Sequence, residues 1–165
     1  MSKVPISRNS VGIAGEFYIA YILAKHGFEV SMSLGRTKGF DLFVVNPNGT
    51  PMVISVKTTY FKVNKFILMN EKADELIGDH LYYAFVRLNA PDGIPEFWIA
   101  PSKIIAPVIK ESHLIWMEGT SKSGKPHQEN PMRNFYLTSR YTFPEDWEES
   151  LESYKSNIKL LEDLV

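Results

Sequence analysis

The sequence contains no cysteine, so it can form neither a disulfide nor a thiolate metal site. A metal ion in this protein would need oxygen or histidine ligands, and the four histidines lack the spacing of a metal-ligand pair. No apolar run is long enough to cross a bilayer, and the first residues, MSKVPISRNS, lack the apolar core of a secretory signal. These absences favour a cytoplasmic protein without a membrane segment.

Neither sign of charge dominates the chain, whose net charge is −1 at pH 7. The charges are unevenly distributed, because residues 144–165 contain seven acidic and two basic residues, whereas residues 1–143 contain 16 basic and 12 acidic ones. This asymmetry fits a basic face for a polyanion, and it fits equally an acidic helix that is only solvated. A chain of 165 residues, 44% of them hydrophobic, is expected to form one domain over residues 1–165.

Hydrophobic periodicity and turn signals predict an α/β protein. A helix is expected over about residues 11–26, because Asn9 or Ser10 can cap its start and Gly27 follows its end. Three strands and a hairpin turn at NPNG are expected next, over 28–34, 39–45 and 52–60. The later patterns predict a short helix within 69–78 and strands at 80–88 and 96–100. A helix is expected from about 101, interrupted or kinked at Pro107. A loop over 119–131 and a C-terminal helix over about 144–163 are expected to follow. This order favours a mixed sheet with helices on both sides.

Three charged residues stand where the pattern predicts burial. Glu16 lies in the apolar stripe of the first helix, and Asp41 and Lys57 lie in strand-forming runs. An ionised group is costly in a core unless it is paired, hydrogen-bonded or bound to a metal. Taken singly, Glu16 fits a position at the edge of the core or a cap to a backbone amide, and Asp41 and Lys57 fit a cross-strand ion pair. A pair alone leaves the third charge unexplained.

The register of the hairpin decides whether Asp41 meets Lys57. A three-residue loop at 48–50 places Asp41 opposite Lys57, with Ser55 on the same face. A two-residue loop at Asn48 and Gly49 instead places Asp41 opposite Val56 and puts the two charges on different faces. A catalytic role for both residues depends on their lying on the same face of the sheet.

Two carboxylates and a lysine beside a hairpin suit metal-assisted hydrolysis of a phosphodiester. The carboxylates hold a divalent ion, and the lysine orients the attacking water or stabilises the transition state. The segments GEFYIAYILAKHGFEV, GFDLFVV and ISVKTT, within residues 10–60, resemble the core of the PD-(D/E)XK, or restriction-endonuclease-like, superfamily, near the branch that contains certain group I intron homing endonucleases.

This resemblance implies a three-layer α/β/α fold of the restriction-endonuclease type. It also implies that Glu16, Asp41 and Lys57 form the catalytic set, and that Glu16, Asp41 and the backbone carbonyl of Val56 bind the metal. The implied cofactor is Mg²⁺, with Mn²⁺ as an alternative, and the implied partner is DNA. A homodimer or a larger homo-oligomer is left open.

One position departs from the family pattern, which places Glu, Asp or Gln two residues before the lysine. This chain has Ser55 there, and a hydroxyl is neutral and shorter, so it reaches a metal only weakly or through water. Three interpretations stay open: a metal-dependent DNA endonuclease with fewer ligands, a catalytically inactive nuclease-fold module that binds DNA or another partner, and a structural domain whose charges only pair.

Basic residues flank the proposed site on both sides in the sequence. Two precede Asp41 and two follow Lys57, within segments that also contain aromatic residues. Lysine and arginine beside a nuclease site suit contacts with backbone phosphates. The residues predicted to bind DNA are Arg36, Lys38, Lys62 and Lys65.

Overall fold

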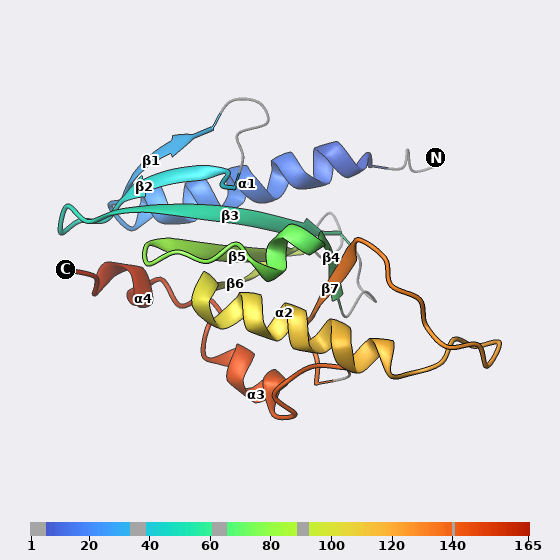
Figure 1. Ribbon diagram of the computed structural model, residues 1–165. Coiled ribbons are helices and arrows are strands. Elements are labelled where there is room, and N and C mark those ends of the chain that lie inside the picture. Colours follow the sequence, from blue (N-terminus) through green and yellow to red (C-terminus); the bar gives the residue numbers. More distant parts are fainter. Residues whose placement is uncertain (1–5, 34–38, 61–65, 89–92, 140) are drawn as a thin grey trace.

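A five-stranded mixed sheet forms the centre of the computed structural model, which describes residues 6–33, 39–60, 66–88, 93–139 and 141–165 (Figure 1). Its strands run in the order β1 (Glu29–Met32), β2 (Leu42–Val45), β3 (Pro51–Thr59), β5 (Leu81–Arg87) and β6 (Glu96–Pro101). The β3 and β5 strands are parallel, and the other neighbours are antiparallel. A second, two-stranded sheet pairs β4 (Phe66–Asn70) with β7 (Met132–Tyr136).

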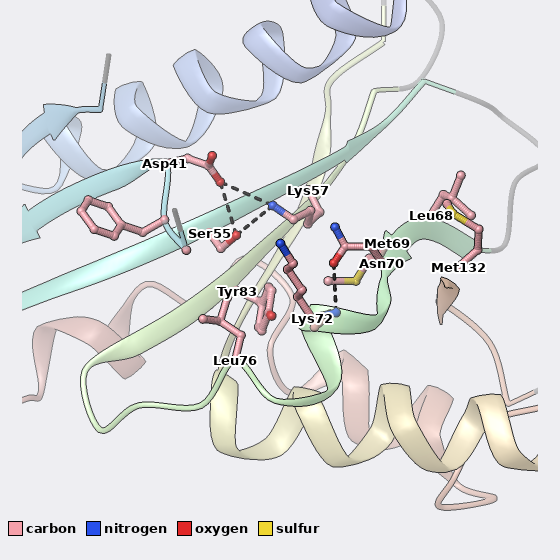
Figure 2. Close-up of a pocket in the computed structure, with 13 residues that line it drawn as sticks. Asp41, Ser55, Lys57, Leu68, Met69, Asn70, Lys72, Leu76, Tyr83 and Met132 are labelled. Atoms are coloured by element: carbon pink, nitrogen blue, oxygen red, sulfur yellow. Dashed lines mark hydrogen bonds and ion pairs between the residues drawn. The ribbon is translucent and has the colours of Figure 1, made fainter. Parts of the chain in front are cut away.

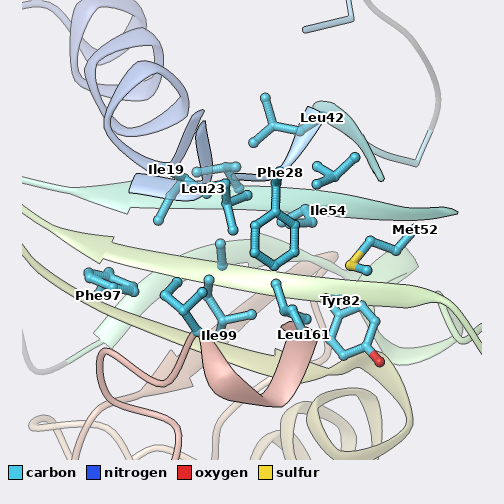
Figure 3. Close-up of a cluster of buried hydrophobic side chains, with 14 of the residues drawn as sticks. Ile19, Leu23, Phe28, Leu42, Met52, Ile54, Tyr82, Phe97, Ile99 and Leu161 are labelled. Atoms are coloured by element: carbon cyan, nitrogen blue, oxygen red, sulfur yellow. The ribbon is translucent and has the colours of Figure 1, made fainter. Parts of the chain in front are cut away.

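Helices cover both faces of the central sheet. On one face, α1 (Arg8–Lys25) and α4 (Lys159–Glu162) share a core with alternate residues of β3, β5 and β6, as Figure 3 shows for Ile19, Ile54, Tyr82, Ile99 and Leu161. On the other face, Tyr83, Phe85 and Trp98 pack in a core with α2 (Ser102–Met117), α3 (Trp147–Glu152) and the β4–β7 sheet. The expected three-layer arrangement, with a mixed sheet between helices, is confirmed.

The first helix begins earlier than the sequence predicts. Ser7, rather than Asn9 or Ser10, is its cap, and the Ser7 hydroxyl accepts a hydrogen bond from the Ser10 amide at 3.0 Å. The helix ends before Gly27, whose φ of +82° is a conformation that glycine adopts without a steric cost. At Gly15 the helix approaches β3 so closely that a Cβ there would lie 2.9 Å from Cβ of Thr58. This contact sets the height of α1 above the sheet.

The hairpin register differs from both sequence alternatives. Val45 pairs with Pro51 and Leu42 pairs with Ile54, so five residues, 46–50, connect the strands. The longer loop exists because Asn46 organises it: its Oδ1 accepts hydrogen bonds from the amides of Asn48 and Thr50, at 3.0 and 2.8 Å.

The observed register places Asp41 next to Ser55 instead of opposite Lys57. The paired positions differ from the expected ones by two residues, and the side-chain period of a strand is two residues. Asp41, Ser55 and Lys57 therefore still share one face of the sheet. A slip of one residue would have separated them.

The C-terminal region forms two short helices instead of one helix over about 144–163. Between α3 and α4 the chain leaves helical geometry, and Ser156 has a φ of +52°. The Ser156 amide donates to the carbonyl of Phe97 at 3.0 Å, and the Ile99 amide donates to the carbonyl of Tyr154 at 3.0 Å. The helix is broken because this segment pairs with the edge of β6, which would otherwise be exposed.

Other expectations are confirmed or adjusted by smaller amounts. The strands expected at 80–88 and 96–100 are β5 and β6, and the short helix expected within 69–78 is a 3₁₀ turn, η1 (Glu71–Asp74). The α2 helix continues through Pro107 without interruption. The patterns did not predict β4 or β7.

Within the described part of the chain, no helix has the length and apolar character needed to span a membrane.

Candidate active site

The carboxylate of Asp41 lies at the start of β2 and is fixed by β3 (Figure 2). Its Oδ2 accepts a hydrogen bond from the Val56 amide at 2.6 Å and one from the Ser55 hydroxyl at 3.4 Å. The same oxygen lies 3.6 Å from Nζ of Lys57. The Asp41 side chain is 29% exposed, so one end of this network is open to solvent. A backbone hydrogen bond that short orients the carboxylate firmly.

The ammonium of Lys57 sits among three oxygen atoms. Besides the Asp41 carboxylate, its Nζ donates to the Ser55 hydroxyl at 2.8 Å and to the Val56 carbonyl at 3.1 Å. Ser55 thus accepts from the lysine and donates to the aspartate, and it links the two charged groups. The Lys57 side chain is 33% exposed. The cluster is therefore a partly exposed ion pair between Asp41 and Lys57 that the Ser55 hydroxyl links by hydrogen bonds.

Glu16 approaches the same cluster from α1. Burial raises the pKa of its carboxyl group, the Asp41 carboxylate raises it further, and the Lys57 ammonium opposes both effects. Within the described part of the chain, the Glu16 carboxylate has no hydrogen bond or ion pair. The structure therefore brings all three charges predicted from the sequence into one electrostatic neighbourhood, with Glu16 its least satisfied member.

The oxygen atoms of this cluster are of the chemical type that binds a divalent ion which keeps several waters. Two carboxylates and one backbone carbonyl are a set that Mg²⁺ accepts, because it binds oxygen and retains part of its hydration shell. The described residues contain no group of three or more histidine, cysteine, aspartate or glutamate side chains that could enclose an ion. The Val56 carbonyl already accepts from Lys57, so a metal and the ammonium compete for that oxygen.

A cleft of about 710 Å³ opens beside the cluster. Gly39, Phe40 and Asp41 line one side of it, and Ser55 and Lys57 contribute from β3. The opposite wall comes from β4, η1 and β7, which the sequence patterns did not place here. The other lining residues are Leu68, Met69, Asn70, Lys72, Ala73, Leu76, Tyr83 and Met132. Glu16 and Val56 do not line the cleft.

The predicted DNA-binding residues Arg36, Lys38, Lys62 and Lys65 lie outside the described residues. Sequence reasoning missed Asn70, Lys72 and Tyr83, which the fold places in the cleft. The run MNEKADE carried part of the signal, because Asn70 caps η1 by accepting from the Lys72 amide at 3.1 Å. An asparagine cap followed by a lysine two residues later does not by itself predict a functional site, because the sequence does not show which elements lie opposite these residues.

Comparisons with known proteins give a likeness in structure but no match in sequence. Neither a scan against protein-family models nor a search of curated proteins finds a match. Solved structures similar to this chain include a bacterial homing endonuclease, I-Ssp6803I, which is 13% identical in sequence. The alignment covers 94% of this chain and 98% of that chain, with a TM-score of 0.47. At this identity and TM-score, the likeness does not bear on the activity of this chain.

Proposed function

We propose that this protein is a metal-dependent DNA endonuclease that hydrolyses phosphodiester bonds. The observation that carries the proposal is the meeting of Asp41 and Lys57, 3.6 Å apart on one face of the sheet at the edge of a cleft. Glu16 supports it, because burial, and secondarily the Asp41 carboxylate, raises the pKa of Glu16 while the Lys57 ammonium lowers it. Asp41 and Lys57 line the open cleft, Glu16 lies within electrostatic range of both, and two carboxylates with a lysine are groups that suit hydrolysis of a phosphodiester.

Each side chain has a defined role in this proposal. Glu16, Asp41 and the Val56 carbonyl would hold Mg²⁺ or Mn²⁺, with Ser55 in contact through water. The ion neutralises phosphate charge and lowers the pKa of a bound water. Lys57 supplies a fixed positive charge for the phosphate in the transition state, and Asp41 is held in place by the Val56 amide.

The test is an assay of supercoiled and single-stranded DNA with Mg²⁺ and with Mn²⁺. The wild-type protein should cleave at least one of these substrates, and EDTA should abolish cleavage. Asp41→Asn should lose activity, while Lys159→Met, a change of an exposed lysine in α4, should keep it. Metal-dependent cleavage that survives Asp41→Asn would place the reaction elsewhere and contradict the proposal.

A second function is favoured by the contacts of Ser55 and Lys57. The lysine occupies the Val56 carbonyl and the serine supplies no charge, so the chain can keep the fold as an inactive module that binds DNA or a partner. Calorimetry with Mg²⁺ or Mn²⁺ and a DNA-binding assay separate the two functions. DNA binding without metal binding or cleavage, under all conditions tried, would favour the inactive module.

A further inference from the structure

The wall of the cleft that faces the Asp41 and Lys57 cluster is largely apolar. Leu68 and Met132 stand at its rim, and their side chains are 53% and 42% exposed. Leu76 and the buried Tyr83 also line the cleft. Exposed apolar side chains gathered around a concavity mark a place where another molecule is bound.

Tyr83 lines this cleft and has an unpaired polar atom. The residue is fully buried, its ring stacks on Phe85 at a centroid distance of 5.7 Å, and its hydroxyl has no hydrogen-bond partner within the described part of the chain. Burial, and secondarily the Asp74 carboxylate, raises the pKa of Tyr83 to about 12, so the hydroxyl stays protonated at neutral pH. A buried donor without a partner is costly, and a ligand that accepts its hydrogen bond removes that cost.

Positive charge borders the cleft on two sides. Lys57 lies on the β3 side, and Lys72 rises from η1 on the other side, with its ammonium end directed toward the cleft (Figure 2). Lys72 has no ion pair with any residue that the structure describes, so its charge is available to a ligand. The amide of Asn70 stands beside it. Apolar walls with cations at the rim complement a flat ring joined to a phosphate.

We propose that this cleft seats one unpaired nucleotide of the DNA, next to the phosphate held at Asp41 and Lys57. The base enters between Leu68, Leu76 and Met132 and accepts a hydrogen bond from Tyr83, and the adjoining phosphate lies at Lys72. This inference rests on the proposed function and narrows its substrate. A base stacked within an intact duplex cannot reach Tyr83 without leaving the stack, which costs a few kcal/mol. DNA with a single-stranded or mismatched nucleotide at the site is therefore the preferred substrate.

The test measures binding in EDTA, so it does not depend on catalysis. Fluorescence anisotropy compares a single-stranded oligonucleotide with a duplex of the same sequence. The wild-type protein should bind the single strand at least about tenfold more tightly, because no base has to leave a duplex stack. Lys72→Met should weaken binding of the single strand, whereas Lys159→Met, on α4, should not.

Two variants test the inside of the cleft. Tyr83→Phe keeps the ring and removes the hydroxyl, so single-strand affinity should fall by about three- to tenfold while the midpoint of urea unfolding rises, because an unpaired buried donor is lost. Leu76→Trp should fill the cleft and abolish the preference for single strands without abolishing duplex binding. A Tyr83→Phe protein that is less stable and equally selective would assign the hydroxyl a structural role with Asp74 and overturn the inference.

The outcomes for the two proposals are distinct. If the wild-type protein cleaves DNA but binds single strands and duplexes equally, the nucleotide subsite is rejected and the nuclease function stands. If the wild-type protein neither cleaves nor binds any DNA, both are rejected.

Discussion

The side chain of Lys57 turns back along its own strand and donates a hydrogen bond to Oγ of Ser55, two residues earlier, at 2.8 Å. A serine hydroxyl is neutral and short, so it reaches a metal only weakly or through water. The same hydroxyl holds the ammonium beside Asp41. One residue would therefore influence both the strength of the proposed metal site and the position of the lysine.

Ser55→Glu should tighten the binding of Mg²⁺ and Mn²⁺. A glutamate on this face is long enough to reach an ion held by Asp41 and Glu16, and it adds a negative charge. We expect the Kd to fall by about tenfold or more, measured by calorimetry. Ser31→Glu, at an exposed serine of β1, is the matched control and should leave the Kd unchanged. If Glu16, Asp41 and Lys57 only satisfy one another, Ser55→Glu will cost stability and create no metal site.

Lys57→Met should have opposite effects on metal binding and on cleavage. Removing the ammonium frees the Val56 carbonyl and the Ser55 hydroxyl, so divalent ions should bind more tightly. Cleavage should fall by about 10²–10³-fold, because a fixed charge that stabilises the transition state is lost. Calorimetry and a plasmid-nicking assay measure the two effects. Equal cleavage by this variant and the wild-type protein would remove Lys57 from the catalytic set.

Glu16→Gln should change the pH dependence of stability. Because burial and Asp41 raise the pKa of Glu16 in the folded state, the folded protein binds this proton more tightly than the unfolded chain does. The resulting stabilisation is complete below the pKa of the unfolded chain and is lost as the pH rises through the raised pKa. The variant should therefore gain stability relative to the wild type as the pH rises through this range.

Urea unfolding at pH 4 and pH 7 measures this difference. A saturating divalent ion should reduce it at pH 7 by stabilising the ionised carboxylate of the wild type. The same difference between the two proteins at both pH values would show that Glu16 titrates normally.

Two glycines of α1 provide a matched pair of substitutions. A Cβ at Gly15 would clash with Thr58 Oγ1, so Gly15→Ala should push α1 away from β3 and cost about 1–3 kcal/mol. A Cβ at Gly12 meets no atom within 4 Å, so Gly12→Ala should stabilise the helix by up to about 1 kcal/mol. Urea unfolding distinguishes the two signs. Gly15→Ala should also weaken metal binding, because α1 carries Glu16.

The sequence predicted the layers, the main strands and the three charges, because each depends on local patterns. Strand-forming runs predicted β3 and β5, the second of them almost continuously apolar, and charged residues in apolar surroundings marked Glu16, Asp41 and Lys57. The hairpin register was wrong because it depends on the side chain of Asn46, which lengthens the loop to five residues. The shared face was preserved only because the error was two residues, the period of a strand.

The far wall of the cleft was missed for a different reason. The β4 strand pairs with β7, whose partner residues lie more than 60 positions away, such as Leu68 with Asn134. No local pattern specifies such a pairing, and each strand has only five residues. From the sequence alone, Lys72 is therefore expected to be an ordinary surface lysine and Tyr83 an ordinary core tyrosine. The fold places both at one cleft.

The loop that sets the hairpin register is also hydrogen-bonded to the C-terminal segment, which is synthesised last. Asn46 donates to the carbonyl of Leu161 at 3.0 Å, and Asn48 donates to the carbonyl of Glu162 at 2.8 Å. These bonds join residues 115 and 114 positions apart, so they form late during folding, after a large loop has closed. On the ribosome, Asp41, Ser55 and Lys57 emerge more than a hundred residues before the segment that secures their hairpin. The newly made chain therefore carries its candidate active-site residues well before it can hold the strands beneath them in their final alignment.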